Sequence, residues 1–179
     1  SETIDGALTR VMWAGETAVL YCDGTSWTKI GGKTIPMAIG LQANSNTTST
    51  SGNLVKVTLG ATQSLNAPAS TYSTSTSTIT AGRAGVYAIQ YSVRYFNIGA
   101  ASTYEAVLYI NGSAVYLTAT YPPGAGNYPT VGAGVAQTLA VGDALTLYCR
   151  QYTGSNQTVS GTNVGIYETF IYAQEIPQW

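Results

Sequence analysis

Three strand signals in the middle of the chain constrain its fold more than any other feature. Between residues 86 and 96, apolar and polar side chains alternate, which is the pattern of a strand with one face in a core. Two glycine-containing turns follow, Asn111-Gly112 and Gly142-Asp143, each between further alternating segments. Glycine reaches the positive φ that a tight hairpin needs, so such turns join neighbouring antiparallel strands. We therefore expect consecutive antiparallel strands here.

The same pattern extends over most of the chain. The core face of segment 86–96 is predicted to consist of Tyr87, Ile89, Tyr91, Val93 and Tyr95. Further strands are expected at 104–110, 114–121, 131–139, 144–149 and 164–174. Many short strands between turn signals, with no helical periodicity, are typical of an antiparallel sandwich or jelly roll. The fold class predicted is all-β, with essentially no helix.

The N-terminal region predicts a separate small β-hairpin. Segments 17–22 and 25–30 flank Asp23-Gly24, a dipeptide that favours a type I′ turn. After Ala43 the chain is almost wholly polar as far as Asn53, which indicates a connector. The Thr-rich tract 70–78 is compatible with an exposed edge strand. The domains predicted are a hairpin region at 1–40, a polar linker at 41–53 and a jelly-roll head at 54–179.

The composition favours an assembly and excludes some partners. Only 8% of the 179 residues are charged, against about 25% in an average domain, while 45% are hydrophobic. A chain with so little charge is expected to hide surface against copies of itself. The seven basic residues are scattered, which argues against nucleic acid. Because no apolar run approaches the length of a membrane span, we expect no membrane insertion.

The two cysteines, Cys22 and Cys149, each lie in an alternating segment. We interpret them as buried thiols that pack as small hydrophobic groups, and a disulfide between them is the alternative. Two cysteines at this spacing do not predict a zinc site.

Catalytic chemistry is weakly represented. The chain has no histidine, which removes the commonest general base and metal ligand. Glu105 and Glu168 are the carboxylates that a glycosidase pair would need, but carboxylates matched to Arg94 or Arg150 are the preferred interpretation. Asp143 is the one calcium candidate, and a turn-forming role is preferred for it. We predict no enzyme activity, no cofactor and no metal.

Aromatic side chains provide the candidate binding residues. Tyrosine offers a large, rigid and amphipathic contact area, and it stacks on sugar faces as well as on protein. Of the 14 tyrosines, Tyr121, Tyr128 and Tyr152 fall in or beside the two longest predicted loops, 121–130 and 151–163. Core packing is the alternative role for each. We predict that these three tyrosines form a receptor-binding surface.

The order of the motifs resembles one family of β proteins. Gly85-Val86-Tyr87, Asn111-Gly112, Gly142-Asp143 and the terminal Phe170-Ile171-Tyr172-Ala173 are similar to the complement-type globular head, a tumour necrosis factor-like jelly roll. The resemblance implies a homotrimer that binds ligands. The collagen stalk that precedes such heads is missing from this sequence. The N-terminal Asp23-Gly24-Thr25-Ser26-Trp27 resembles a hairpin module of bacteriophage tail and head fibres.

Together these resemblances predict a non-enzymatic, trimeric bacteriophage fibre head. Its expected partner is a host-cell surface glycan or protein, with other virion proteins contacted through the N-terminus, and its expected location is the virion. One alternative is a structural component that decorates a capsid or caps a fibre. Another is a secreted complement-like ligand.

Overall fold

The structure is a computed structural model in which residues 3–4, 12, 15–67, 71–96, 98–99, 101–161 and 169–177 are described. The chain divides into two compact units, Ser1–Pro36 and Met37–Gln178. We refer to them as the hairpin unit and the head. The described part of the chain contains no α-helix, and none of its segments is a helix able to cross a membrane.

The hairpin unit contains a three-stranded sheet in the order β1-β3-β2. Its strands are β1 (Thr3–Ile4), β2 (Val19–Cys22) and β3 (Ser26–Gly31). The β2–β3 pair is antiparallel, whereas β1 runs parallel to β3. This arrangement confirms the predicted hairpin.

The turn of this hairpin differs from the predicted type I′ turn. The Asp23 amide donates to the Ser26 carbonyl at 3.2 Å, so Gly24 and Thr25 are the two central residues. Gly24 alone of the four has positive φ, at 96°, which matches a type II′ turn. The reason lies in the Asp23 carboxylate, whose Oδ1 accepts the amides of Thr25 and Ser26 at 2.8 Å each. Asp23 thus precedes the central pair and caps it.

The head contains two β-sheets, and all strand pairs within them are antiparallel. The seven-stranded sheet has the order β5 (Thr47–Ser49), β15 (Gln157–Val159), β10 (Gly85–Phe96), β16 (Phe170–Ile176), β4 (Ala38–Gln42) and β7 (Ala61–Asn66). Its seventh strand, β13 (Thr130–Leu139), pairs with β10. The six-stranded sheet has the order β12 (Ser113–Thr120), β11 (Tyr104–Ile110), β14 (Ala144–Gln151), β9 (Thr78–Thr80) and β8 (Tyr72–Ser73). Its sixth strand, β6 (Val55–Lys56), pairs with β14.

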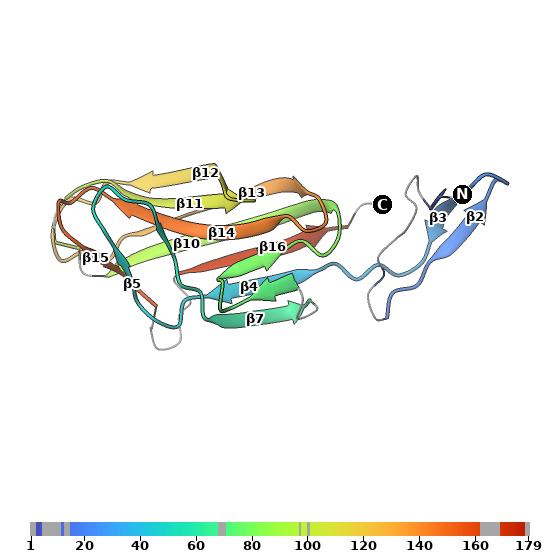
Figure 1. The fold of residues 1–179 in the computed structure, drawn as a ribbon, viewed down its shortest axis with the longest axis horizontal. Coiled ribbons are helices and arrows are strands. Elements are labelled where there is room, and N and C mark those ends of the chain that lie inside the picture. The colour runs from blue at the N-terminus through green and yellow to red at the C-terminus, as the bar shows by residue number, and fades with distance from the viewer. Residues whose placement is uncertain are drawn as a thin grey trace. The chain divides into compact units, whose positions relative to one another are not determined.

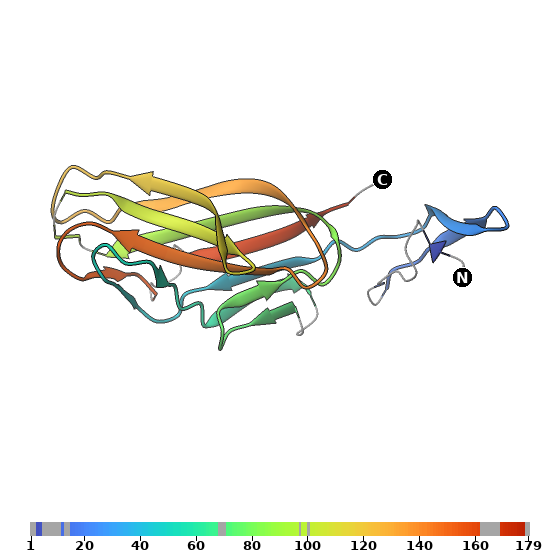
Figure 2. The same ribbon diagram turned by 45° about the horizontal axis from the view of Figure 1, so that its top comes forward.

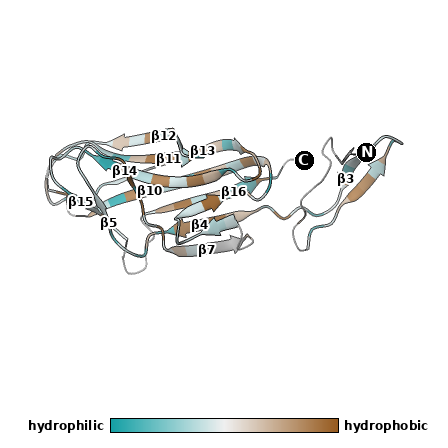
Figure 3. Ribbon diagram, viewed as in Figure 1, coloured by the Kyte–Doolittle hydropathy of each residue, from teal (hydrophilic) through white to brown (hydrophobic). Residues whose placement is uncertain are grey.

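The two sheets of the head lie face to face and enclose one core (Figures 1 and 2). Hydrophobic and hydrophilic positions alternate along strands such as β14 (Figure 3). The predicted core face of β10 is confirmed: Tyr87, Ile89, Tyr91, Val93 and Tyr95 are all buried. In each strand of the sandwich, one set of alternate residues therefore faces the core and the other faces outward, so the head has two outer faces, one on each sheet.

The other predicted turns form as expected. Asn111 and Gly112 both have positive φ, at 51° and 77°, which is the type I′ geometry between β11 and β12. The Asp143 amide donates to the Ala140 carbonyl at 3.2 Å, and the Asp143 carboxylate accepts the Ala140 amide at 2.8 Å. Asn111 Nδ2 also donates to this carboxylate at 2.7 Å, which ties the two turns together. Asp143 therefore acts as a turn former.

The predicted linker at 41–53 is wrong, because this segment belongs to the head. Its first two residues end β4, and β5 pairs with β15 in the seven-stranded sheet. Polar contacts hold its two buried polar residues in the sheet: Thr47 accepts the Thr58 amide at 3.0 Å, and Gln151 donates to the Ser49 carbonyl at 2.9 Å. The head begins at Met37.

The Thr-rich tract and the last strand agree with the predictions where they are described. β8 is the edge strand of the six-stranded sheet, and Ser70 lies outside the described residues. β16 overlaps the predicted strand at 164–174, whose first five residues also lie outside the described residues.

A buried ion pair lies in the head beside the start of β4. Arg83 Nη2 and Glu175 Oε2 are 2.8 Å apart, and both side chains are about nine-tenths buried. The same Glu175 oxygen accepts the Met37 amide at 3.1 Å. The Tyr87 hydroxyl donates to the Arg83 carbonyl, and burial together with the Glu175 charge raises the pKa of Tyr87 to about 12. This cluster fixes the start of the head to its last strand.

Both cysteines are free thiols. Cys149 is fully buried, as predicted, and burial raises the pKa of its thiol to about 11. The predicted burial is wrong for Cys22, which is only partly buried because it lies beside the exposed Asp23-Gly24 turn. The alternative of a disulfide between them is not formed in the structure.

Candidate recognition surface at the loop end of the head

Three loops meet at one end of the head: those between β10 and β11, β12 and β13, and β14 and β15. We call this edge the loop end. Ile98 and Asn127 share a backbone hydrogen bond of 3.0 Å, and the Gly126 amide donates to the Ile98 carbonyl at 3.0 Å. The Tyr152 amide donates to the Thr103 carbonyl at 3.2 Å. These bonds hold the loops to one another.

The structure brings all three predicted binding residues to this end. Thr120 and Gln151 both pair with Tyr104, so Tyr121 and Tyr152, which follow them, leave the sheet at the same level. Their side chains are exposed by 69% and 47%, and that of Tyr128 by 45%. The predicted loop position and exposure are therefore observed. Their role in binding stays a prediction.

Tyr128 belongs to an aromatic cluster on the outer face of the seven-stranded sheet. Its ring meets Phe96 edge to face, with centroids 5.2 Å apart and planes at 77°. The Arg94 guanidinium carbon lies 5.4 Å from the Tyr128 centroid, in the range of a cation–π contact. Phe96 was not predicted as a binding residue. The alternation of β10 could have identified it, because Phe96 follows the buried Tyr95 and therefore points outward, where it is exposed.

Tyr152 belongs to a second cluster, on the six-stranded sheet. The Arg150 guanidinium carbon lies 5.3 Å from the Tyr152 centroid. Arg150 Nε donates to Glu105 Oε2 at 2.6 Å, and this hydrogen bond raises the pKa of Arg150. The preferred interpretation of Glu105, a carboxylate matched to an arginine, is confirmed. Glu168, its proposed catalytic partner, lies outside the described residues.

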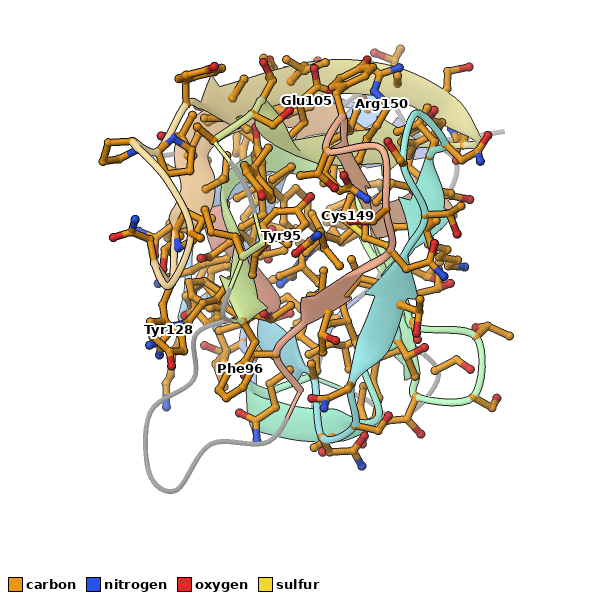
Figure 4. The ribbon with its side chains drawn as sticks, turned by 90° about the vertical axis from the view of Figure 1, so that its left-hand side faces the viewer. Tyr95, Phe96, Glu105, Tyr128, Cys149 and Arg150 are labelled. Carbon is orange, nitrogen blue, oxygen red and sulfur yellow. The ribbon has the colours of Figure 1, made fainter. Side chains whose placement is uncertain are left out.

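The two clusters lie on opposite layers of the sandwich. Seen from the loop end, Glu105 and Arg150 lie on one side, Tyr128 and Phe96 on the other, and Tyr95 and Cys149 between them (Figure 4). Tyr95 is fully buried, and its hydroxyl lies 2.8 Å from the carbonyl oxygens of Glu105 and Arg150. Burial raises the pKa of Tyr95 well above its usual value. Tyr128 and Tyr152 therefore belong to two different surfaces.

A network of amide side chains orders the loop that carries Tyr152. Gln151 is fully buried, and its Nε2 donates to the carbonyls of Ser49 and Ser155 at 2.9 and 2.7 Å. Its Oε1 accepts the amide and the hydroxyl of Thr153, both at 2.7 Å. Every hydrogen-bonding site of this side chain is used. The loop is thus held by Gln151 from inside, and Tyr152 remains at the surface.

Comparisons with known proteins support the fold and leave the ligand open. No family model and no curated relative matches the chain. The Eiger tumour necrosis factor from S. frugiperda matches with a TM-score of 0.58 at 15% identity, covering 80% of this chain and 94% of that one. Murine APRIL at pH 5.0 matches with a TM-score of 0.58 at 14% identity, covering 79% and 100%. The head therefore has the tumour necrosis factor-like jelly-roll fold that the sequence motifs predicted.

Proposed function

We propose that this chain is a non-enzymatic, trimeric binding protein whose head attaches to a cell-surface receptor. The observation that carries the proposal is the loop end, where Tyr121, Tyr128 and Tyr152 are exposed on loops that hydrogen bonds hold in place. Ordered loops that present large aromatic side chains bind at a low entropic cost. A glycan is the favoured receptor because aromatic rings stack on sugar faces.

The proposed trimer would use the outer face of the seven-stranded sheet away from the loop end, so that Tyr128 and its contacts with Phe96 and Arg94 stay exposed. Among described residues that point outward from β10, β13 and β16, Arg94 is the single charged side chain, and it lies at the loop end. The remaining positions of this face are uncharged: Val86, Ala88, Gln90, Ser92, Phe96, Thr130, Gly132, Gly134, Ala136, Thr138, Phe170, Tyr172, Gln174 and Ile176. A broad face without charge is suited to burial against another copy.

Light scattering tests this assembly. The wild-type chain is expected to have three times the monomer mass at micromolar concentration. Ala136→Arg places a charge on this face, at an exposed position of β13 opposite Ala88 of β10, so it should yield a folded monomer. Ala140→Arg, at an exposed turn residue outside the sheet, is the matched control and should remain a trimer. A monomeric wild-type chain, or a trimer that tolerates Ala136→Arg, contradicts the proposal.

The biological setting that we propose is a bacteriophage fibre, with the hairpin unit attached to other virion proteins. It is supported by the resemblance of the Asp23-Gly24 hairpin to fibre modules. The secreted-ligand alternative is supported by the similar solved structures, two of which are a tumour necrosis factor and APRIL.

Cell binding distinguishes these settings. Labelled protein is incubated with bacterial and with animal cells, each with and without periodate oxidation of surface sugars. Saturable, periodate-sensitive binding to bacteria supports a fibre head that recognises a glycan. Saturable binding to animal cells alone supports the secreted ligand. If no cell type binds the protein saturably, the receptor proposal is wrong and a structural role in the virion is favoured.

A further inference from the structure

Two tyrosines and an arginine form a row along one strand of the six-stranded sheet. Tyr148, Arg150 and Tyr152 occupy alternate positions of β14 and the residue that follows it, so they project to the same side. Cys149 and Gln151, between them, are fully buried. The row therefore lies on the outer face of the head. Alternate residues of a strand are about 7 Å apart, which gives the row a length of about 13 Å.

A third aromatic ring widens this row. Tyr109, on the neighbouring strand β11, stacks obliquely on Tyr148 with centroids 4.3 Å apart and planes at 36°. Val107 lies between β14 and β12 on the same outer face, where it pairs with Tyr148 and Leu117. Although no second sheet covers this face, only 2% of Val107 is exposed. The large side chains around it thus provide an apolar surface on the sheet.

Arg150 supplies polar donors in the middle of the row. Its Nε is bonded to Glu105, but neither of its terminal Nη groups hydrogen-bonds a described residue. The Glu105 carboxylate holds the guanidinium plane and balances its charge, so the Nη groups act as oriented donors without a strong positive field. Because about a quarter of the side chain is exposed, these donors can meet a ligand.

This combination fits a carbohydrate chain. Sugar rings have apolar C–H faces that stack on tyrosine, and their hydroxyl or carboxylate oxygens accept from arginine. A surface that is long and shallow suits several linked sugars better than a single small molecule, which binds in a concave pocket. The balanced charge disfavours a polyanion such as nucleic acid.

We infer that the outer face of the six-stranded sheet binds an extended oligosaccharide along Tyr148, Arg150 and Tyr152, with Tyr109 beside them. The inference rests on the proposed function and deepens it. It assigns Tyr152 to a site that continues from the loop end onto the sheet, and it leaves Tyr128, on the opposite layer, outside that site. The site also remains accessible when the seven-stranded sheet is buried in the proposed trimer.

The test uses the full chain and an array of immobilised neutral and acidic oligosaccharides, followed by titration calorimetry with the best-binding oligosaccharide. Tyr148→Ala and Tyr152→Ala are each expected to weaken binding roughly three- to tenfold, the range of a single aromatic contact. Glu105→Gln combined with Arg150→Gln removes the donors without leaving a buried charge, and it should weaken binding at least as much. Tyr21→Ala, at an exposed position of the hairpin unit, is the control and should bind as the wild type does. Tyr128→Ala reports whether the opposite layer of the head contributes to binding.

Two precautions keep the result clear. Thermal melting of each variant verifies folding, and Tyr152→Ala, at an exposed position, tests the site even if the change at Tyr148 unfolds the head. Binding of saccharide that depends on Tyr128 but not on Tyr148 or Tyr152 overturns this inference and retains the proposed function. Saturable cell binding that resists periodate, with no array signal, indicates a protein receptor and also overturns it. Loss of all saturable binding overturns both.

Discussion

The hairpin unit and the head use the same strand chemistry with opposite outcomes for their apolar side chains. In the hairpin, Val19, Tyr21 and Ile30 are exposed by 54%, 58% and 64%. In the head, Tyr87 and Ile89 occupy equivalent alternating positions of a strand and are fully buried. Alternation therefore determines only which side chains share a face. A second sheet that covers the face, present in the head, determines whether burial stabilises the strand.

The two units also differ in how their polar groups contribute. The hairpin unit is held by exposed or partly buried bonds, such as Glu16 to the Ile35 amide at 2.7 Å and Lys29 to Thr34 at 2.6 Å. The head contains the nearly buried Arg83–Glu175 pair. A bond in water gains little over its solvated alternative, whereas a buried charge becomes costly when its partner is removed. Matched substitutions should expose this difference.

The largest effect is expected from Glu175→Ala in the head. The change leaves Arg83 buried without its carboxylate and removes the acceptor of the Met37 amide. We expect the free energy of unfolding of the head to fall by about 3–5 kcal/mol. Urea unfolding followed by circular dichroism measures it, and Gln174→Ala, at the exposed neighbouring position, is the control. A loss below about 1 kcal/mol would show that the pair contributes no more than a surface contact.

A pair of matched leucines tests the role of the second sheet. Leu147 in β14 is fully buried, and Leu20 in β2 is 37% exposed. Leu147→Ala removes a core side chain and should lower the free energy of unfolding by about 2–5 kcal/mol. Leu20→Ala leaves the head untouched, so the main unfolding transition should shift by less than about 0.5 kcal/mol. Equal effects on that transition would mean that the two units unfold as one.

The fold was largely predictable because its decisive signals are local. The alternation in 86–96 identifies the buried face of β10, and Asn111-Gly112 identifies the β11–β12 hairpin, since each depends on neighbouring residues alone. β5 was not predictable. Its residues are polar, and it becomes a strand by pairing with β15, more than 100 positions away. The Gln151 side chain, which donates to the Ser49 carbonyl, also holds it in place.

The candidate site was predictable only in part. The exposure of Tyr121 and Tyr152 follows from their place in loops. The row along β14 could not be predicted in this way, because a surface tyrosine and a core tyrosine look alike in the sequence. The pairing with β11 and the contact with Tyr109 show that Tyr148 lies on the outer face. The separation of Tyr128 from Tyr152 likewise depends on the stacking of the two sheets, which no local pattern encodes.

A smaller effect is expected at two glycines that approach a neighbouring backbone. A Cβ on Gly132 in the head would overlap the Tyr91 carbonyl oxygen, and one on Gly32 in the hairpin unit would overlap the Thr17 carbonyl oxygen. Gly132→Ala should destabilise the head by about 1–3 kcal/mol in urea unfolding. Gly134→Ala, where the nearest atom is the Gln90 side chain at 3.8 Å, should cost far less.

The same change in the hairpin unit should stay local. Gly32→Ala is expected to speed amide hydrogen exchange in β2 and β3 while the urea midpoint of the head remains that of the wild type. A shift of the head midpoint with Gly32→Ala would contradict the independence of the two units.

The smallest effect is expected from the turn aspartates as the pH falls. Backbone amides of Thr25 and Ser26 lower the pKa of Asp23, and the Asn111 side chain followed by the Ala140 amide lowers that of Asp143. A carboxylate whose folded pKa is depressed stabilises the fold above its unfolded value, near 3.8, and this contribution disappears as pH falls through the folded value. Both side chains are exposed, so the losses should be modest.

Each loss should be confined to its own unit. Between pH 5 and pH 2, Asp143→Asn should flatten the acid dependence of the melting temperature of the head, while Asp23→Asn should alter only hydrogen exchange in the hairpin. Carboxyl titration by NMR gives the two folded pKa values directly. If the melting temperature of the head responds to Asp23→Asn as strongly as to Asp143→Asn, the hairpin turn stabilises the head, and the difference between the two units does not extend to their folding.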